Sequence, residues 1–443
     1  MKQPFYFIFY LVLVVFFSNQ VLATEISVQP QQNLQQILDD AKPGDQLRLQ
    51  PGIYNGNFVI NRSISLFGNK KAIIDAGNKG RAITINATNV IVNGLVIRSW
   101  GDDLTDIDAG VFIDKKARAA QVSNNQLNGS SFGIWVDATE DVQLLGNIIE
   151  GDASIRSTDR GNGIHLYGVK GALVKGNEVF NTRDGIYIET SNGNELHGNY
   201  LHDVRYGIHY MYSYHNKLIS NRTRNTRTGY ALMQSKFLTV INNHSENDLN
   251  YGILMNFITN STLSGNRIEG AHSLEDGALG TQGKAFFIYN SLFNDINNNL
   301  LSNSDLGIHL TAGSEDNKIW GNAFVGNYEQ VKYVSNRKQE WSENGVGNYW
   351  SDYLGWDMDD DGIGDIAYEP NDSIDKLLWK YPEIKVVLNS PAIEILRWVQ
   401  RQFPVLKAPG IKDSVPLIAP LESNKFDLPA VARVKRIKAE EKL

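Results

Sequence analysis

A short phrase that opens with glycine returns at a fixed interval through the middle of the chain, and this repeat limits the fold most. The opening glycines are 22, 22, 22 and 23 residues apart: Gly163, Gly185, Gly207, Gly229 and Gly252. Apolar residues stand at every second position of each phrase, as Ile186 and Ile188 do, which is the period of a β-strand. A fixed period of this size predicts a solenoid in which each repeat forms one turn of the stack.

A second phrase, which ends in asparagine, falls between the glycine phrases in the same rhythm: Asn177, Asn199, Asn221, Asn243 and Asn266. Glycine and asparagine suit corners because they adopt positive φ angles more readily than other residues. We therefore predict an all-β fold, a right-handed parallel β-helix with about 22 residues per coil. A leucine-rich solenoid is the alternative, but it needs regularly spaced leucines and a helical segment in each repeat, and the sequence has neither.

Composition and charge exclude several classes of function. The chain has 443 residues, a formal net charge of −7 and no cysteine. An acidic chain is a poor partner for nucleic acid, because the phosphate backbone attracts basic surfaces. The lack of cysteine excludes disulfides, thiolate metal ligands and cysteine nucleophiles.

The first 23 residues have the pattern of a secretory signal peptide. Lys2 provides a positive charge, Phe5 to Phe17 form an apolar run, and Ala23 is a small residue at the expected cleavage position. An uncleaved membrane anchor is the alternative, although the run is short against the ~20 apolar residues that a span needs. We predict an exported, periplasmic protein with a signal peptide over residues 1–23.

The rest of the chain divides into a β-helix over residues 24–350 and a C-terminal region over residues 351–443. Near the start, Asn33 to Ala41 has the pattern of an amphipathic helix with Asn33 as its N-cap, which would cover the open end of the β-helix. Near the end, the pattern predicts a helix from Pro391 to Gln402. We predict that the C-terminal region is a cap that docks a partner, and that its tail from Leu428 is mobile.

Two long intervals interrupt the rhythm of the repeat and predict two loops. They span Gly151 to Asn162 and Gly270 to Gln282, and both precede the next opening glycine. We therefore expect both loops to leave the β-helix at the same corner, five coils apart, on either side of the face that carries His209. Decoration without function is the alternative.

One outer face of the predicted β-helix gathers soft metal ligands. If the residue after each opening glycine points inward, the residues two and four places after the glycine point outward. This rule puts His209, Met211 and Met233 on adjacent outward rows, with the two methionines in neighbouring coils. Imidazole and thioether ligands suit Cu(I) and are poor ligands for Mg²⁺ or Ca²⁺. We predict an exposed Cu(I) site at these residues, with His202 and His215 as weaker candidates; packing of the methionines against a loop or a partner is the alternative.

An aspartate-rich segment in the C-terminal region predicts a second metal site. The spacing of a calcium loop of the EF-hand type, with carboxylates at positions 1, 3, 5 and 9 and glycine at position 6, is met by Asp357, Asp359, Asp361 and Asp365. The acid expected at position 12 is missing, because Tyr368 stands there. A solvated acidic turn is the alternative to a Ca²⁺ site.

Catalytic groups are harder to find. The acids on the regular outer face are isolated: Asp137, Asp184 and Glu189. No serine–histidine pair has a readable spacing, and no phosphate-binding loop is present. We therefore predict that the protein is not an enzyme. A polysaccharide lyase or epimerase is the alternative, because β-helices often act on polysaccharides.

Several phrases go beyond the generic pattern of a β-helix: Arg205–Ser213, Phe287–Ser291, Ile308–Ser314, Gly347–Asp352, Leu388–Ala392, Arg397–Trp398 and Gln402–Pro404. On these phrases the chain resembles the NosD family, periplasmic accessory proteins for nitrous oxide reductase, over essentially its whole mature length. The resemblance implies a β-helix in the periplasm, an ABC-type ATPase and its membrane subunit as partners, and a role in assembling the copper–sulfide centre of the reductase. It supplies no agreed ligand motif, so the predicted Cu(I) site depends on the row pattern.

Together, the residues and the resemblance predict a non-enzymatic scaffold that docks partners and transfers copper or a sulfur species. Its expected partners are nitrous oxide reductase, the ABC ATPase and membrane subunits, and a copper chaperone, and no nucleic acid. Two other hypotheses stay open: the carbohydrate-active enzyme, and a structural adaptor that binds no metal. Cu(I) binding by the mature protein separates the transfer scaffold from the adaptor.

Overall fold

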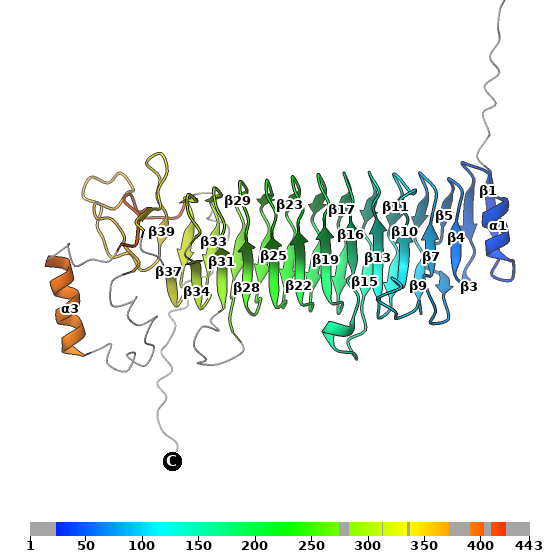
Figure 1. The fold of residues 1–443 in the computed structure, drawn as a ribbon, viewed down its shortest axis with the longest axis horizontal. Coiled ribbons are helices and arrows are strands. Elements are labelled where there is room, and N and C mark those ends of the chain that lie inside the picture. The colour runs from blue at the N-terminus through cyan, green and yellow to red at the C-terminus, as the bar shows by residue number, and fades with distance from the viewer. Residues whose placement is uncertain are drawn as a thin grey trace, which may run out of the picture.

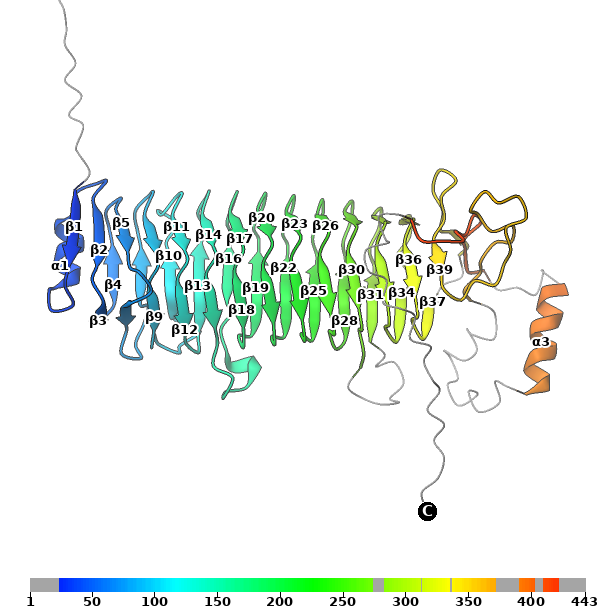
Figure 2. The same cartoon turned by 180° about the vertical axis from the view of Figure 1, so that it is seen from behind.

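Parallel strands stacked in three long sheets make up most of the structure (Figure 1). The computed structural model describes residues 24–273, 283–311, 313–334, 337–371, 390–402 and 409–421. Within these residues the three sheets have 13, 12 and 13 strands, and neighbouring strands pair in parallel. The predicted parallel β-helix is therefore confirmed, and Figure 2 shows the same stack from behind.

Each coil contributes one strand to each sheet. The first sheet contains β1 (Glu25–Val28), β2 (Gln46–Leu49), β5 (Ser65–Phe67), β8 (Ile91–Asn93), β11 (Gln121–Ser123), β14 (Gln143–Leu145), β17 (Leu173–Lys175), β20 (Glu195–His197), β23 (Lys217–Ile219), β26 (Thr239–Ile241), β29 (Thr262–Ser264), β32 (Asp295–Asn297) and β35 (Lys318–Trp320). The second sheet contains β4 (Phe58–Ile60), β7 (Ile83–Ile85), β10 (Ala109–Ile113), β13 (Phe132–Asp137), β16 (Ile164–Tyr167), β19 (Asp184–Glu189), β22 (Tyr206–Met211), β25 (Thr228–Met233), β28 (Tyr251–Asn256), β31 (Lys284–Tyr289), β34 (Leu306–Thr311) and β37 (Glu329–Val334). The third sheet contains β3 (Gly52–Asn55), β6 (Ala72–Asp75), β9 (Val96–Arg98), β12 (Gln126–Asn128), β15 (Ile148–Glu150), β18 (Glu178–Phe180), β21 (Tyr200–His202), β24 (Arg222–Arg224), β27 (His244–Glu246), β30 (Arg267–Glu269), β33 (Leu300–Ser302), β36 (Ala323–Val325) and β39 (Tyr349–Trp350).

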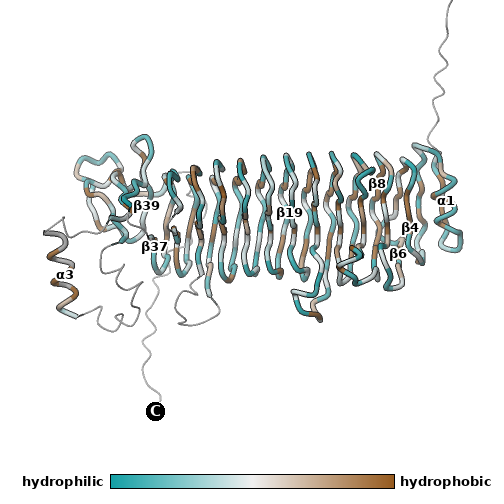
Figure 3. Tube along the Cα trace, in the orientation of Figure 1, coloured by the Kyte–Doolittle hydropathy of each residue, from teal (hydrophilic) through white to brown (hydrophobic). Residues whose placement is uncertain are grey.

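The hydrophobic core fills the inside of the coils. Ile186, Ile208, Tyr230 and Ile253 are successive register partners in the second sheet, and all four side chains are buried in the core. Figure 3 shows apolar and polar segments alternating along each coil. The predicted inward position, one residue after each opening glycine, is therefore confirmed.

The opening glycine breaks the alternation of each strand in the second sheet. A Cβ at Gly185 would lie 2.6 Å from the carbonyl oxygen of Gly207 and 3.2 Å from the side chain of Leu201, so this position faces the inside of the coil. Ile186 also faces inside, which makes two consecutive inward positions. The residue before the glycine, Asp184, is therefore turned toward the outer face.

A ladder of asparagines runs along one corner of the stack and is fully buried. In each step the side-chain Nδ2 of one asparagine donates to Oδ1 of the asparagine in the next coil: Asn125, Asn147, Asn177, Asn199, Asn221, Asn243, Asn266, Asn299, Asn322 and Asn348. The ladder ends on the buried carboxylate of Asp413, which accepts from the backbone N–H of Asn348 at 2.7 Å and from Trp350 Nε1 at 2.8 Å. These bonds join the C-terminal region to the last coil.

A short helix covers the N-terminal end of the β-helix, as predicted. Helix α1 (Leu34–Asp40) begins after Asn33, whose side chain accepts from the backbone N–H of Gln36. Gln35 satisfies the exposed edge of β4: its side chain accepts from the N–H of Val59 at 2.9 Å and donates to the carbonyl of Val59 at 3.0 Å. The helix thus occupies hydrogen-bonding groups that would otherwise invite another strand.

The C-terminal region contains little regular structure among its described residues. A two-stranded sheet pairs β38 (Gln339–Glu340) with β40 (Ile411–Lys412), and helix α3 (Pro391–Gln402) has the predicted bounds. In the part of the chain that the structure describes, no helix has the length and apolar character needed to cross a membrane. The predicted signal peptide and the tail from Leu428 lie outside the described residues.

Candidate functional site

The outer face of the second sheet carries the predicted rows of ligands. Met211 on β22 is the direct register partner of Met233 on β25, and His209 stands opposite Ala231. Both methionine side chains are half-buried, and none of these four residues belongs to the main core. The two thioethers therefore lie on one flank in neighbouring coils, two residues along the strand from the imidazole.

His209 is less accessible than predicted. Its side chain is 10% exposed, because the ring stacks on Tyr187 at a centroid distance of 4.4 Å and meets the edge of Tyr206 at 5.0 Å. Its register partners in the neighbouring coils are Tyr187 and Ala231, so it belongs to the outer face although it is covered. The prediction of an exposed imidazole is wrong, since flanking aromatic rings shield it from solvent.

A buried carboxylate holds His209 in place. Asp184 is 1% exposed and accepts from Arg205 Nε at 2.8 Å, from Arg205 Nη2 at 2.7 Å and from His209 Nδ1 at 3.0 Å. Burial favours the neutral acid, but the hydrogen bonds from His209 and Arg205 outweigh it and lower the pKa of Asp184. Asp184 is therefore ionised at neutral pH.

The ionised carboxylate fixes the proton of the imidazole. A carboxylate only accepts hydrogen bonds, so Nδ1 of His209 carries the hydrogen. Nε2 is buried and has no hydrogen-bond partner among the described residues. A carboxylate that orients one imidazole nitrogen while the other stays free for a metal is a common arrangement at metal sites. The free nitrogen and the two thioethers therefore fit a soft metal ion.

The predicted isolation of the outer-face acids is wrong for two of them. Besides the bonds of Asp184, the carboxylate of Glu189 lies 3.6 Å from Nε2 of the buried His165, and the nearby imidazole lowers the pKa of Glu189. Burial in turn lowers the pKa of His165. A strict alternation of inward and outward residues would place Asp184 inside the coil. The alternation fails at Gly185, so the sequence pattern does not reveal that Asp184 reaches the outer face. The separation of 21 residues between Asp184 and Arg205, close to one repeat, is the signal that could have found the pair.

The two weaker histidine candidates lie away from this face. His202 is on β21 of the third sheet, where it stacks on Phe180 and bonds to Asp203 at 2.7 Å. His215 lies in the turn after β22 and stacks on Phe237 at 4.7 Å. Neither is brought together with His209.

The two predicted loops both connect the third sheet to the second, five coils apart. The loop before β16 contains a short 3₁₀ helix (Ser157–Asp159), and Arg160 holds it by donating to the carbonyls of Ile155 and Asn181. Of the loop before β31, residues 274–282 lie outside the described residues. At its start, His272 pairs with Asp305 at 2.8 Å.

The aspartate loop brings three of its four predicted ligands together. Carboxylate oxygens of Asp357, Asp359 and Asp361 all lie within 4.8 Å of one another, and repulsion from Asp361 raises the pKa of Asp359. Asp365 is not part of this group, and its Oδ2 accepts from the backbone N–H of Met358 at 2.8 Å. The hydroxyl of Tyr368, at the twelfth position, donates to Asp352.

Comparisons with known proteins find a matching family model and two close relatives. A family model described as "Periplasmic copper-binding protein (NosD)" matches residues 145–355. A protein of Pseudomonas aeruginosa, named "Probable ABC transporter binding protein NosD", is 60% identical over 373 residues, which cover 84% of this chain and 87% of the relative. A protein of the same name from Stutzerimonas stutzeri is 58% identical over 375 residues, which cover 84% of this chain and 86% of the relative.

Solved structures share the fold at low sequence identity. A family 28 exopolygalacturonase of Yersinia enterocolitica gives a TM-score of 0.57 at 11% identity, over 70% of this chain and 77% of that enzyme. The A-module of the mannuronan C-5 epimerase AlgE6 of Azotobacter vinelandii gives 0.56 at 14% identity, over 71% of this chain and 93% of that module. At such identities the likeness shows the fold alone. The two relatives, in contrast, match at high identity over most of their length, and the chain therefore belongs to the NosD family.

Proposed function

We propose that the protein carries Cu(I) in the periplasm and presents it for assembly of the copper–sulfide centre of nitrous oxide reductase. The observation that supports this best is the direct pairing of Met211 with Met233 beside the carboxylate-held imidazole of His209. The family model describes its members as periplasmic and copper-binding. The ion is cargo in this proposal, and the protein performs no catalytic step.

The three side chains offer the donor atoms that Cu(I) prefers. Thioethers and neutral imidazole bind a soft cuprous ion, whereas hard divalent ions prefer oxygen ligands. Because Nδ1 of His209 donates to Asp184, Nε2 is the nitrogen through which the imidazole would coordinate the ion. The two thioethers carry no charge, so they bind the ion less strongly than thiolates or carboxylates would and allow its release to an acceptor.

Access to the imidazole requires movement of the Tyr187 and Tyr206 rings that cover it in this proposal. Nε2 of His209 is buried, whereas Met211 and Met233 are only half-buried. Methionine has three rotatable bonds and adapts readily to a changed environment. Movement of the rings would admit the ion, and the two methionine side chains would then turn toward it.

Removal of both sulfurs tests the site. Replacing Met211 and Met233 together by leucine keeps the volume of the side chains nearly constant. We expect Cu(I) affinity, measured by competition with a chelator, to fall at least about tenfold, and the copper content of the matured reductase to fall with it. Met358→Leu is the control, because Met358 is 83% exposed in the aspartate loop. Unchanged Cu(I) affinity in the double variant would reject the site.

The proposal includes two sets of partners. The relatives are named as probable ABC transporter binding proteins, and we propose that the C-terminal region after Trp350 docks the membrane subunits of such a transporter. The transporter's ATPase would supply the energy of ATP hydrolysis. Pull-down of the mature protein with the reductase, with and without the transporter subunits, tests this division of roles. Binding to neither partner rejects it.

We also propose a structural Ca²⁺ ion at the aspartate loop. The convergence of Asp357, Asp359 and Asp361 supports it, and Asp365 stands at a position that often binds Ca²⁺ through water. Added Ca²⁺ should raise the unfolding temperature of the wild type. Asp359→Asn with Asp361→Asn should abolish the rise. An identical unfolding temperature in Ca²⁺ and in a chelator rejects this site.

A further inference from the structure

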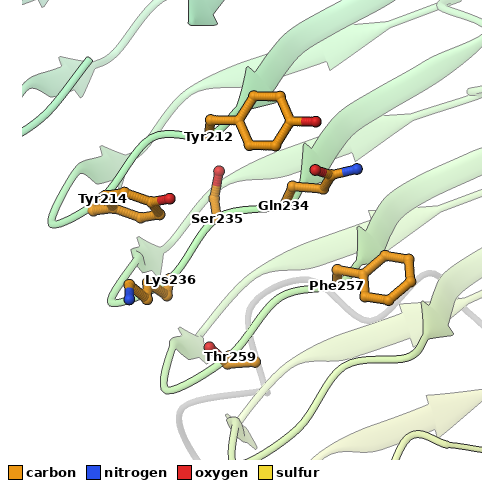
Figure 4. A pocket seen from close by; sticks show the side chains of 7 residues that line it. All are labelled: Tyr212, Tyr214, Gln234, Ser235, Lys236, Phe257 and Thr259. Carbon is orange, nitrogen blue, oxygen red and sulfur yellow. The ribbon is translucent and has the colours of Figure 1, made fainter. Parts of the chain in front are cut away.

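Five aromatic side chains and one lysine gather where the second sheet turns into the first. We name them the aromatic corner: Tyr212, Tyr214, Lys236, Phe237, Phe257 and Phe293. Four of the aromatic rings are between 42% and 56% exposed. Figure 4 shows that side chains from three successive turns of this corner line one cavity, of about 420 Å³.

Two earlier coils carry glycine at the position equivalent to Phe237, and the coil directly before it carries His215. Backbone hydrogen bonds align Gly171, Gly193, His215, Phe237, Asn260 and Phe293 in successive turns. All of these residues have left-handed backbones, with φ of 67° at Gly193 and 57° at both Phe237 and Phe293. Glycine adopts this region freely, whereas a bulky side chain is disfavoured there. The phenylalanines therefore stand where the fold itself favours glycine or asparagine.

The same contrast appears one row nearer to the methionines. Tyr212 follows Met211, and Phe257 follows Asn256, which is the register partner of Met233. Both aromatic residues are left-handed, with φ of 50° and 55°. Exposed aromatic side chains in a disfavoured conformation add nothing to the core, so their presence indicates a use on the surface.

The charge of the corner is opposite to that of the whole protein. The ammonium group of Lys236 lies 5.1 Å from the ring centre of Tyr214 and 5.8 Å from that of Phe237. Lys236 makes no ion pair with any carboxylate among the described residues. The four turns 211–216, 233–238, 256–261 and 289–294 contain no acidic residue, although the chain has a net charge of −7. This corner therefore offers an unpaired cation among apolar rings.

We infer that the aromatic corner is the docking surface for the protein that exchanges Cu(I) with Met211 and Met233, and that this partner presents an apolar side chain beside a carboxylate. The apolar side chain fills the cavity, and the carboxylate pairs with Lys236. The inference rests on the proposed copper transfer. It places the partner directly beside the two thioethers, because the corner begins at the residue that follows Met211.

A protein partner fits this corner better than a polysaccharide does. Sugars bind to open, aligned ring faces, but the rings of Phe237 and Phe257 each pack against a neighbouring ring outside the corner. His215 stacks on Phe237 at an interplanar angle of 10°, and Phe257 meets Tyr289 edge to face at 79°. Clustered, partly exposed aromatic residues are instead typical of a protein interface.

The test compares binding and copper affinity in matched variants. Phe237 and Phe257 are replaced together by asparagine, the residue at the equivalent positions of the following coils, Asn260 and Asn290. The probe is apo-nitrous oxide reductase, and association is measured by biolayer interferometry at low and high salt. We expect the dissociation constant to rise at least about tenfold, while Cu(I) affinity stays unchanged. Tyr328→Asn is the control, since Tyr328 is 89% exposed and follows β36 at another corner.

Charge variants complete the test. Lys236→Gln should weaken association about threefold to tenfold and reduce its salt dependence, whereas Lys236→Arg should retain both. Wild-type association in the double asparagine variant, or no association of the wild type, overturns the inference. The inference is also overturned if the double asparagine variant binds the reductase normally but loses self-association or oligouronate binding. The occupant of the corner is then a second copy of the chain or a sugar. If the wild type binds no Cu(I), the proposed copper transfer is rejected. Association with the apo-reductase then decides separately whether the aromatic corner is a docking surface.

Discussion

The asparagine ladder and the outer face around His209 come from the same repeat, but they treat buried polar groups in opposite ways. Asn221 in the ladder accepts two hydrogen bonds from Asn199 and donates to a carbonyl and to Asn243. On the outer face, Nε2 of His209 is buried without a hydrogen-bond partner among the described residues. An unsatisfied buried group costs about 1–3 kcal/mol. The hydrogen bonds of the ladder thus stabilise the fold. The unsatisfied imidazole nitrogen on the outer face destabilises it, so its presence there indicates a function other than stability.

The largest expected effect lies in the ladder. Asn221→Leu removes four hydrogen bonds and leaves the neighbouring asparagines unsatisfied. We expect the free energy of unfolding, measured in urea, to fall by about 4 kcal/mol or more. Asn128→Leu is the control, because Asn128 is exposed on β12, and we expect a change within about 0.5 kcal/mol. A loss below about 1 kcal/mol for Asn221→Leu would show that the ladder does not hold the coils together.

The next effect is expected at the buried ion pair of the outer face. Asp184→Asn leaves Arg205 without its counter-charge and should lower the free energy of unfolding by about 3 kcal/mol at pH 7. The pKa of Asp184 is lowered in the folded protein, so its stabilisation is present above the unfolded pKa and is lost as pH falls through the folded pKa. The difference between wild type and variant should therefore shrink in acid. Glu189→Gln, at a half-exposed position, is the control and should cost less.

The repeat explains why the fold was predictable and the site only partly so. Gly185 and its counterparts recur at a constant interval, and both the inward rows and the pairing of Met211 with Met233 follow from counting. Helix α1 was predictable because its cap and apolar face are local. The cover over His209 was not, because it depends on the orientation of the Tyr187 and Tyr206 rings in three dimensions.

Neither the network around Asp184 nor the aromatic corner could be predicted from the sequence, and the reasons differ. Asp184 reaches the outer face only because two consecutive residues, Gly185 and Ile186, both face inward. The corner becomes noticeable only when backbone angles show that Phe237 occupies a glycine-like position. Among the calcium candidates, spacing predicted the convergence of Asp357 with two neighbours, but it did not predict that Asp365 bonds to the backbone.

A second buried carboxyl group, Asp248, differs from Asp184 in its hydrogen-bond partners and in the direction of its pKa shift. Asp248 accepts hydrogen bonds from the hydroxyls of Thr223, Thr226 and Ser245, and no cation among the described residues pairs with it. Burial raises the pKa of Asp248 to about 6. Its stabilisation is therefore present below the unfolded pKa of 3.8 and is lost as pH rises through about 6, the opposite direction to Asp184.

We expect the wild type to lose about 2–3 kcal/mol relative to Asp248→Asn between pH 4 and pH 7. Urea unfolding of both proteins across this range measures the difference. Asparagine is a suitable replacement, because its Oδ1 still accepts from the backbone N–H of Thr226 and its Nδ2 donates to the hydroxyls. A constant difference across the range would contradict the raised pKa of Asp248.

The smallest effect on stability, with the opposite sign, is expected at the aromatic corner. Phe237 is 42% exposed with a φ of 57°, and the left-handed region costs a bulky residue roughly 1–2 kcal/mol. Phe237→Asn loses the contact with His215 but relieves the backbone, so the unfolding free energy should stay constant or rise by up to about 1 kcal/mol. Thermal unfolding measures this change, with Tyr328→Asn as control. A clear loss of stability would make Phe237 a structural residue like those of the ladder, and the corner would then need no partner to explain it.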